Sequence, residues 1–309
     1  MKIGVSMIVK NEEYMLPDCL ESVKDFDEIV IVDTGSEDRT VEIAGEYGDV
    51  YFFEWIDDFA AARNFSLSKC TADWILIIDA DERFRSTPDE VRKAIKKAKD
   101  KPFMLVDVAI CPGEDFDKPQ YLQKALRFLR RSDKVQYGRK IHNSLMYDGD
   151  MARPRTMAYD SGLKMVSGFS PAHENDPDRT FRLLKAELEQ NPNSTRDLYY
   201  LATEYLHKKQ DDAEALQLLQ RYFMLTFARP PWSNEFADAC YLMATIYVNQ
   251  KNWPMAMSAA FSSIMAWHTF KAPYVMIAKL CEIGNLEAAA KYWGEQAEKA
   301  TNEGVLFIR

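Results

Sequence analysis

The 309-residue chain carries a formal net charge of −9, which argues against broad binding to nucleic acids or anionic membranes. Its length suggests about two domains, and 47% of its residues are hydrophobic. No apolar run approaches the roughly 18–20 residues that span a bilayer, and the charged residues after the first apolar run do not fit a signal peptide. The five cysteines form no C-x-x-C pair, so zinc and thioredoxin-like sites are not indicated and a reducing cytoplasm is the expected location.

Apolar strands and helical stretches alternate through the first part of the chain. We predict strands over residues 3–9, 28–33, 51–54, 74–78 and 102–110. Between the strands we predict helices over residues 14–24, 36–47 and 59–68, and a further helix that begins at Thr87 and Pro88. Ser36 and Thr87 are the expected N-caps, and Gly48 lies just beyond the second helix. This alternation, with almost entirely apolar strands, predicts a mostly parallel sheet covered on both faces.

Polar side chains follow three of these strands where each strand ends. Asn11 follows the first strand, Asp33 ends the second, and the run W-I-L-I-I-D-A-D ends in Asp79 and Asp81. Because the carboxyl ends of parallel strands meet at one edge of a sheet, we expect these side chains to form one ligand site, and we place Asn11 among its nucleotide-binding residues. Adjacent carboxylates repel each other unless a cation joins them, and a divalent ion bridging to a diphosphate would do so. The alternative is an acidic surface turn.

Four motifs in a fixed order carry a resemblance to a known family. They are S-M-I-V-K-N-E-E at residues 6–13, V-D-T-G-S-E-D-R-T at 32–40, F-A-A-A-R-N at 59–64 and D-A-D-E at 79–82. In this order they resemble the inverting family 2 glycosyltransferases, which have the GT-A fold, a Rossmann-like α/β domain. A weaker likeness follows at residues 126–131 and 138–143. The resemblance implies transfer of a sugar from a nucleotide-diphosphate donor.

The resemblance also implies a role for each matching residue. Asp33 would hydrogen-bond the nucleotide base, and Arg63 with Asn64 would contact the nucleotide. Asp79 would lie near the ribose, and Asp81 would ligate Mn²⁺ or Mg²⁺. The side-chain chemistry agrees, since a carboxylate accepts an N–H and a guanidinium binds phosphate or stacks on a base. Two simpler alternatives stay open: Asp33 could only stabilise a turn, and Arg63 could form a surface salt bridge.

Two histidines could complete the site. His142 lies in G-R-K-I-H-N, which resembles the family's Gly-x-Ile-His-Glu, and it is our first choice for a second metal ligand or for contact with the acceptor. His173 is the second choice. Asn143 stands where the family usually has glutamate, and an amide cannot serve as the catalytic base. The base therefore stays unassigned.

The middle of the chain offers fewer signals. Residues 127–139 are rich in arginine and lysine. They could face the diphosphate, an anionic acceptor or only solvent, and we favour solvent. Residues 111–115 and 147–168 are rich in turn-forming residues, which predicts loops, and such loops often determine acceptor specificity.

From about Asp178 the chain becomes amphipathic helix. The segment D-L-Y-Y-L-A-x-x-Y at residues 197–205 is echoed by A-C-Y-L-M-A-x-x-Y at 239–247 and more faintly at 273–278. These echoes predict tetratricopeptide-like helical hairpins, with small residues such as Ala202 and Ala244 allowing close packing. We therefore predict a GT-A catalytic domain over residues 1–175 and an all-helical domain over residues 176–309, which serves as a platform and could bind a protein partner.

Together these features predict a metal-dependent inverting glycosyltransferase with a nucleotide-diphosphate sugar, expected to be UDP-linked, as donor. A base would deprotonate the acceptor hydroxyl as it attacks the anomeric carbon. The acceptor class stays open among a glycan, a lipid-linked sugar, a peptide and a modified nucleic-acid base. The alternatives are a catalytically inactive scaffold that binds partners, and a nucleotidyltransferase, which would need a glycine-rich loop where K-N-E-E stands.

Overall fold

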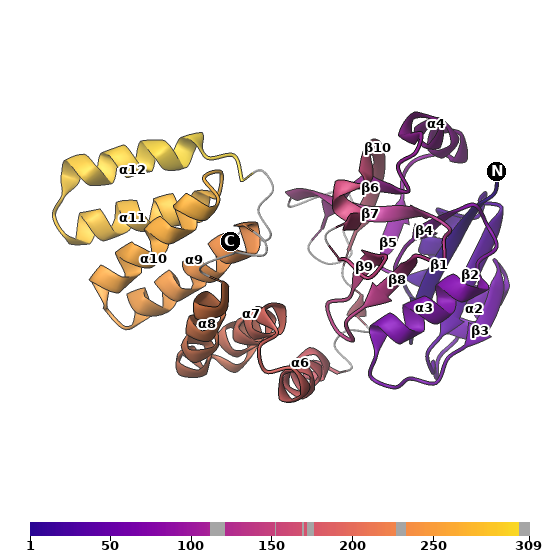
Figure 1. Cartoon of the computed structure of the whole chain (residues 1–309), viewed down its shortest axis with the longest axis horizontal. Helices are drawn as coiled ribbons and strands as arrows, with labels where there is room; N and C mark the ends of the chain where they lie inside the picture. Colours follow the sequence, from indigo (N-terminus) through magenta and orange to yellow (C-terminus); the bar gives the residue numbers. More distant parts are fainter. Residues whose placement is uncertain (112–120, 152, 169, 172–175, 227–232, 303–309) are drawn as a thin grey trace. The chain divides into compact units, whose positions relative to one another are not determined.

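The computed structural model describes the chain except for residues 112–120, 152, 169, 172–175, 227–232 and 303–309. The chain divides into two compact units, Met1–Pro177 and Asp178–Arg309 (Figure 1). The first unit is an α/β structure built on an eight-stranded sheet, and the second is helical throughout its described residues. The predicted fold class, an α/β domain followed by an all-helical region, is confirmed.

Eight strands form the main sheet of the first unit, in the order β3-β2-β1-β4-β7-β6-β10-β5. Their bounds are β1 Ile3–Val9, β2 Glu28–Asp33, β3 Asp49–Phe52, β4 Trp74–Ile77, β5 Glu82–Phe84, β6 Phe103–Ile110, β7 Tyr121–Arg130 and β10 Ala158–Ser167. The first four strands of this order run parallel, as do β6 and β10, whereas β7 is antiparallel to both its neighbours and β5 is antiparallel to β10. A separate antiparallel hairpin pairs β8 (Val135–Gly138) with β9 (Ser144–Tyr147).

Both faces of the sheet are covered, as the apolar strands require. The helices of this unit are α1 Leu16–Glu21, α2 Thr40–Gly45, α3 Phe59–Lys69, α4 Pro88–Ala98 and α5 Arg153–Thr156. Residues of α1, α2 and α4 share one core with Trp74 and Leu76 of β4. Residues of α3 and the β8–β9 hairpin share a second core with Ile75 and Ile77. Because successive side chains of a strand point to opposite faces, the two cores lie on opposite sides of the sheet, and Figure 1 shows α3 crossing β1 and β2.

The second helix begins later than the sequence predicts. Ser36 does not cap it, because α2 starts at Thr40 and the N-cap residue Arg39 makes no side-chain capping bond. The Ser36 hydroxyl instead accepts a hydrogen bond from the backbone N–H of Asn11 at 2.9 Å. A loop held to the end of β1 therefore takes the place of the predicted first helical turn.

Two other boundary signals have different outcomes. Thr87 caps α4 as predicted: its hydroxyl accepts the Glu90 N–H, and the Glu90 carboxylate accepts the Thr87 N–H, which makes a capping box. Gly48 was expected to follow the end of a helix. Its main feature is instead that it lies very close to the backbone of β2. A Cβ there would come within 2.3 Å of the Ile29 carbonyl oxygen, so only glycine fits beside β2.

The turn-forming residues in 147–168 predict loops, but Ala158–Ser167 in this segment form the strand β10. β10 pairs in parallel with β6 and antiparallel with β5. Gly162, which contributed to the loop prediction, has φ +67° and lies within a register shift between Asp160 and Lys164. The glycine therefore accommodates an irregularity within a strand and does not end it. The other predicted loop, residues 111–115, lies outside the described residues from position 112 onward.

The second unit consists of successive helices that pack in pairs, α7 with α8, α9 with α10 and α11 with α12. The bounds are α6 Arg179–Gln190, α7 Thr195–Glu204, the π-helical turn η2 Tyr205–Lys209, α8 Asp212–Thr226, α9 Ser233–Asn249, α10 Trp253–Ala266, α11 Lys271–Ile283 and α12 Glu287–Lys299. The three echoed segments fall in the first helix of each pair, where Ala202, Ala244 and Ala278 are buried. The tetratricopeptide-like assignment stays a prediction.

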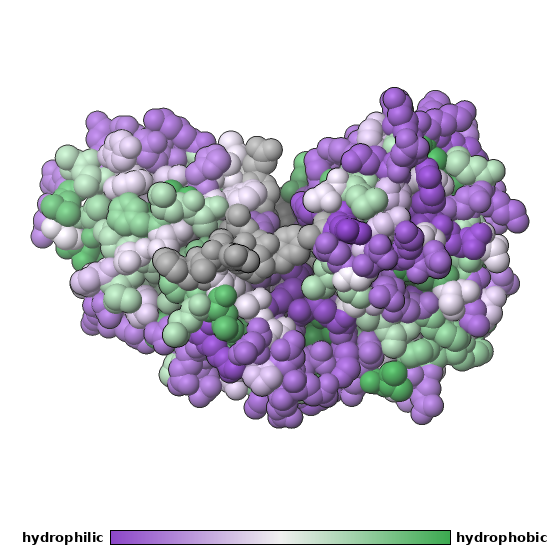
Figure 2. Space-filling model, in the orientation of Figure 1, coloured by the Kyte–Doolittle hydropathy of each residue, from purple (hydrophilic) through white to green (hydrophobic). Residues whose placement is uncertain are grey.

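Apolar side chains lie on the surface of this unit. Figure 2 shows them over the face of the helical unit that is in view. Helix α10 contains no charged residue, and its Met255, Phe261 and Met265 side chains are exposed. Throughout the described residues, no helix is both long enough and apolar enough to cross a membrane.

Candidate active site

The predicted strand-end residues converge because their strands are neighbours. β2, β1 and β4 lie side by side and parallel, and Val9 at the end of β1 is level with Asp33 at the end of β2. Beyond β4, the Ile78 N–H still bonds the Ser6 carbonyl at 3.4 Å. The segments that carry Asn11, Asp33 and Asp79 therefore leave the same edge of the sheet, as predicted.

Asp33 stabilises the loop after β2. Its side chain is 2% exposed, and its carboxylate accepts the backbone N–H groups of Gly35 at 2.9 Å and Ser36 at 3.1 Å. Asn11 holds the same loop, since its side-chain oxygen accepts the Glu37 N–H at 2.8 Å. Asp33 therefore does stabilise a turn, as the simpler alternative stated. A carboxylate has about four acceptor sites, so these bonds do not exhaust it.

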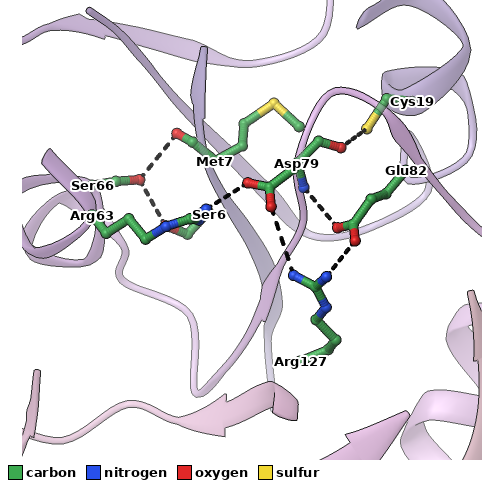
Figure 3. Close-up of polar contacts among 8 residues, drawn as sticks. All are labelled: Ser6, Met7, Cys19, Arg63, Ser66, Asp79, Glu82 and Arg127. Carbon is green, nitrogen blue, oxygen red and sulfur yellow. Dashed lines mark hydrogen bonds and ion pairs between the residues drawn. The ribbon is translucent and has the colours of Figure 1, made fainter. Parts of the chain in front are cut away.

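Asp79 lies between two arginines (Figure 3). Arg63 donates from Nη2 to Asp79 Oδ1 at 2.7 Å, and Arg127 Nη1 lies 3.8 Å from Asp79 Oδ2. Arg127 also forms an ion pair through Nη2 with the buried Glu82 carboxylate, whose other oxygen accepts the Asp79 N–H at 3.0 Å. The Cys19 thiol donates to the Asp79 carbonyl at 3.3 Å. Four groups from separate elements therefore fix Asp79.

Helix α3 presents Arg63 to this cluster. The helix starts with an Asp58 cap, whose side chain accepts the Ala61 N–H at 2.9 Å. One turn beyond Arg63, the buried Ser66 hydroxyl bonds the Ser6 hydroxyl of β1 at 2.6 Å (Figure 3). Because the helix is capped at its start and bonded to β1 within its length, the position of Arg63 beside Asp79 is defined by the sheet.

Asn64 contacts the protein backbone. Its side-chain amide donates to the Tyr137 carbonyl at 2.9 Å and accepts the Tyr137 N–H at 2.7 Å, which joins α3 to β8. The Arg63 guanidinium lies 5.6 Å from the centre of the Tyr137 ring, a cation–π distance. The arginine–asparagine pair of the motif thus has two tasks: Asn64 attaches the helix to the hairpin, and Arg63 faces Asp79.

Asp81 belongs to an acidic group that also contains Glu12. We quoted Glu12 as part of a sequence motif but predicted no role for it in the site. Burial and the neighbouring Asp79 raise the pKa of Asp81 to about 6. Burial raises the pKa of Glu12 to about 7, although the hydrogen bond from the Ser170 hydroxyl at 2.6 Å lowers it; Asp81 and Asp79 raise it further. The backbone N–H of Ser170 also bonds Asp81. Glu12 and Ser170 are far apart in sequence, so no local motif pairs them.

The histidine candidates are less closely defined. His142 lies between β8 and β9 with φ +46°, in a loop whose Lys140 carbonyl accepts the N–H of Phe59 at the start of α3 at 2.9 Å. The loop that carries His142 and Asn143 therefore lies against the helix that presents Arg63. His173 lies outside the described residues.

The basic segment divides among three environments. Arg127 faces Asp79 and Glu82 with 18% of its side chain exposed, so our preference for solvent is wrong at this residue. Arg130 lies 5.3 Å from the Trp74 ring on the opposite face of β7, and Arg131 donates to the Ala72 carbonyl. Lys134 is exposed, as expected.

Curated relatives include glycosyltransferases. Over 260 residues the chain is 28% identical to the SPbeta prophage-derived glycosyltransferase SunS of Bacillus subtilis, covering 81% of this chain and 60% of SunS. It is 36% identical over 143 residues to a TPR repeat-containing protein of Synechococcus elongatus, covering 46% and 34%. It is 28% identical over 171 residues to the lipopolysaccharide core biosynthesis glycosyltransferase LpsC of Rhizobium meliloti, covering 50% and 61%. The chain spans between about a third and three-fifths of the length of these relatives.

Solved structures with a distant likeness include S. aureus TarS 1-349 in complex with UDP-GlcNAc. The TM-score is 0.44 and the identity 14%, over 97% of this chain and 92% of that one. The family model for glycosyl transferase family 2 matches residues 5–161, from β1 into β10. Since this match covers most of the β-sheet, the strand-end acids and more than half of the chain, the chain belongs to glycosyl transferase family 2.

Proposed function

We propose that this chain transfers a sugar from a nucleotide-diphosphate donor, with UDP as the expected nucleotide, to a hydroxyl acceptor with inversion at the anomeric carbon. The observation that carries this proposal is the meeting of two acids, Asp79 and Asp81, with the arginines Arg63 and Arg127 at one edge of the sheet. A diphosphate needs cationic partners and a divalent ion needs carboxylates. This edge offers both, and membership of the family supports the same reaction.

The nucleotide base is proposed to lie at the loop that follows β2. Asp33 is fixed there by its bonds to the loop backbone, so its carboxylate is oriented before any ligand arrives. A remaining acceptor site on that carboxylate would take an imide N–H of the base. Asn11, which holds the same loop, defines its shape. Preorganisation of this kind lowers the entropic cost of binding.

Asp81 is the proposed ligand for Mn²⁺ or Mg²⁺. Its carboxylate is partly buried near Asp79 and Glu12, which is an unfavourable place for an anion and a favourable one for a hard cation. Within the described residues, no group of three or more His, Cys, Asp or Glu side chains is arranged to hold a metal ion. The remaining ligands would be donor phosphate oxygens, water and, as we propose, His142. The ion, when bound, would neutralise charge on the leaving diphosphate.

On the acceptor side, Asn143 is excluded as the catalytic base, and His142 is a candidate for the base or for contact with the acceptor. Asn143 cannot take a proton from the acceptor near neutral pH, so the base lies elsewhere. His142 could act as base or acceptor contact only when it does not bind the metal. Loss of metal affinity in His142→Ala would support the ligand role, whereas lost transfer with intact metal and donor binding would support the other. A glycan, a lipid-linked sugar, a peptide and a modified nucleic-acid base all stay candidates for the acceptor.

The test is hydrolysis of a panel of nucleotide sugars in the presence of Mn²⁺, together with calorimetry of UDP binding. We expect Mn²⁺-dependent binding of UDP and slow hydrolysis of at least one UDP-sugar. Asp81→Asn should abolish both without unfolding the protein. Asp73→Asn is the matched control, because Asp73 directly precedes the same strand β4 at its opposite end and its side chain is 56% exposed.

Three results would count against the proposal. If the wild-type protein binds no nucleotide and hydrolyses no donor, the inactive-scaffold alternative gains support. If Asp81→Asn and Asp73→Asn behave alike, Asp81 is not the metal ligand. Preference for a nucleoside triphosphate over every nucleotide sugar would favour the nucleotidyltransferase alternative.

A further inference from the structure

Arg127 reaches Asp79 by two routes. The direct route is the ion pair between Arg127 Nη1 and Asp79 Oδ2 at 3.8 Å. The second runs through Glu82, which is 2% exposed, pairs with Arg127 Nη2 and accepts the backbone N–H of Asp79 at 3.0 Å. One guanidinium therefore restrains both the side chain and the backbone of Asp79 (Figure 3).

The orientation of Arg63 depends in turn on Asp79. The hydrogen bond from Arg63 Nη2 to Asp79 Oδ1 is 2.7 Å long, and the guanidinium also lies over the Tyr137 ring. The buried Nε atoms of Arg63 and Arg127 have no hydrogen-bond partner among the described residues. Both guanidiniums are therefore held at their Nη ends, by Asp79 and Glu82. A displacement of Asp79 would release Arg63.

The sheet explains why Arg127 occupies this place. The pairing of β4 with β7 runs from Trp74 opposite Arg130 to Leu76 opposite Phe128. Arg127 follows directly on that register, beside the point where β4 leaves the sheet toward Asp79. Arg127 is the residue left out where the pairing of β7 with β6 shifts, between Phe128 opposite Met104 and Leu126 opposite Leu105. It shares Asp79 with Arg63 of α3, whereas Arg130 lies against Trp74, which belongs to the core on the other side of the sheet.

We propose that Arg127 is a positioning residue of the donor site, acting through Glu82 and Asp79 on Arg63. This inference rests on the proposed function, since it concerns the site that would bind the nucleotide diphosphate. The two arginines and two carboxylates balance in charge, which makes their burial together tolerable. Removal of Arg127 leaves Asp79 and Glu82 adjacent without their shared cation, so the Asp79 backbone and the Arg63 guanidinium lose their fixed positions.

The experiment compares Arg127→Met with Arg130→Met. The control removes an arginine from the same strand, three residues away and on the opposite face. The measurements are UDP affinity with Mn²⁺ by calorimetry, and KM and kcat for hydrolysis of the UDP-sugar that the wild type cleaves. Arg127→Met should weaken UDP binding and raise KM by roughly 10- to 100-fold, the effect of losing a charge-assisted hydrogen bond. Arg130→Met should retain the wild-type KM.

A double-mutant cycle separates positioning from a merely structural role. If Arg127 acts on Arg63, through the Asp79 side chain or through Glu82 and the Asp79 backbone, adding Arg127→Met to Arg63→Met should change KM by less than about twofold. Additive losses would show that Arg127 acts independently and would overturn the inference. If Arg127→Met does not fold, Glu82→Gln carries the test, because it removes the charge of the relay at nearly constant volume. An unchanged KM in Glu82→Gln would then overturn the inference.

The two proposals can fail separately. A wild-type protein that binds neither UDP nor any UDP-sugar overturns the proposed function and this inference with it. Normal binding by the wild type together with the same KM in Arg127→Met overturns this inference alone. Loss of folded protein without a change in KM of the folded fraction would identify Arg127 as purely structural, which also contradicts the positioning role.

Discussion

Removal of the Asp79 carboxylate should destabilise the first unit by about 2–4 kcal/mol. With an effective dielectric constant of about 20, the attraction is about 6 kcal/mol to Arg63 at 2.7 Å and about 4 kcal/mol to Arg127 at 3.8 Å. Much of this attraction offsets the cost of removing the three groups from water. The Asp79 side chain is 34% exposed, so solvent screens the pairs further. In Asp79→Asn the two guanidiniums would face each other without their shared anion.

Hydrogen exchange followed by mass spectrometry can measure this loss locally. The peptide that contains β4 and Asp79 should exchange about 30- to 900-fold faster in Asp79→Asn, which corresponds to the same 2–4 kcal/mol if it opens with the unit. Asp73→Asn, at the exposed opposite end of the strand, should change the free energy of opening measured by exchange by less than about 0.5 kcal/mol. Peptides of the helical unit provide an internal reference within each sample.

A second substitution tests the stated cause. Adding Arg63→Met to Asp79→Asn removes the cation that has lost its carboxylate partner, whereas Arg127 keeps Glu82, so part of the lost protection should return. If the double variant exchanges faster than either single variant by the sum of their effects, the charge argument is wrong. Wild-type exchange in Asp79→Asn would likewise refute it, because it would mean that solvent already satisfies the two arginines.

Three further predictions follow from local features. Gly48→Ala should lower the melting temperature of the first unit, because its Cβ would meet the Ile29 carbonyl at 2.3 Å, whereas Gly45→Ala at the end of α2 has nothing within 4 Å and should be neutral or stabilise by up to about 1 kcal/mol. Thr87→Ala should cost about 0.5–2 kcal/mol and speed amide exchange in α4 through loss of the capping box; unchanged exchange would contradict the cap. The third concerns pH. Burial and Asp79 raise the pKa of Asp81 to about 6, so below that pH the folded chain holds a proton that the unfolded chain releases near pH 4. The Asp81 contribution should therefore make the metal-free protein less stable as pH rises from about 4 to 6, and Asp81→Asn should flatten that part of the melting profile.

The sequence predicted the part of the site that depends on strand order. Parallel strands that neighbour one another end at the same edge, so Asn11, Asp33 and Asp79 could be grouped without knowledge of the fold. The Thr87 cap was equally predictable, because a capping box is complete within four residues. Signals of this kind are local or follow from a simple topological rule.

Contacts between distant segments could not be predicted in the same way. Ser170 reaches Glu12 across 158 positions, and Arg127 reaches Glu82 across 45. Neither pair has a spacing that a helix or strand period would reveal. The antiparallel entry of β7 between β4 and β6 also breaks the parallel pattern of the first half. The basic run at residues 127–139 therefore led us to predict side chains that face solvent. The environment of each side chain of β7 depends instead on the face of the strand on which it lies.

The central place of β7 in the sheet has a consequence for how the protein is made. A nascent chain that has emerged only to about residue 100 contains all four family motifs, but β4 still has an unpaired edge and Asp79 and Glu82 lie together without Arg127. The cluster of Arg63, Asp79, Glu82 and Arg127 can therefore be complete only after synthesis has passed Arg127 and β7 has docked. A fragment of about the first 100 residues, which retains all four motifs, should therefore bind no nucleotide. The motifs locate the site in the sequence, but the site also needs Arg127 of β7, which follows them in the chain.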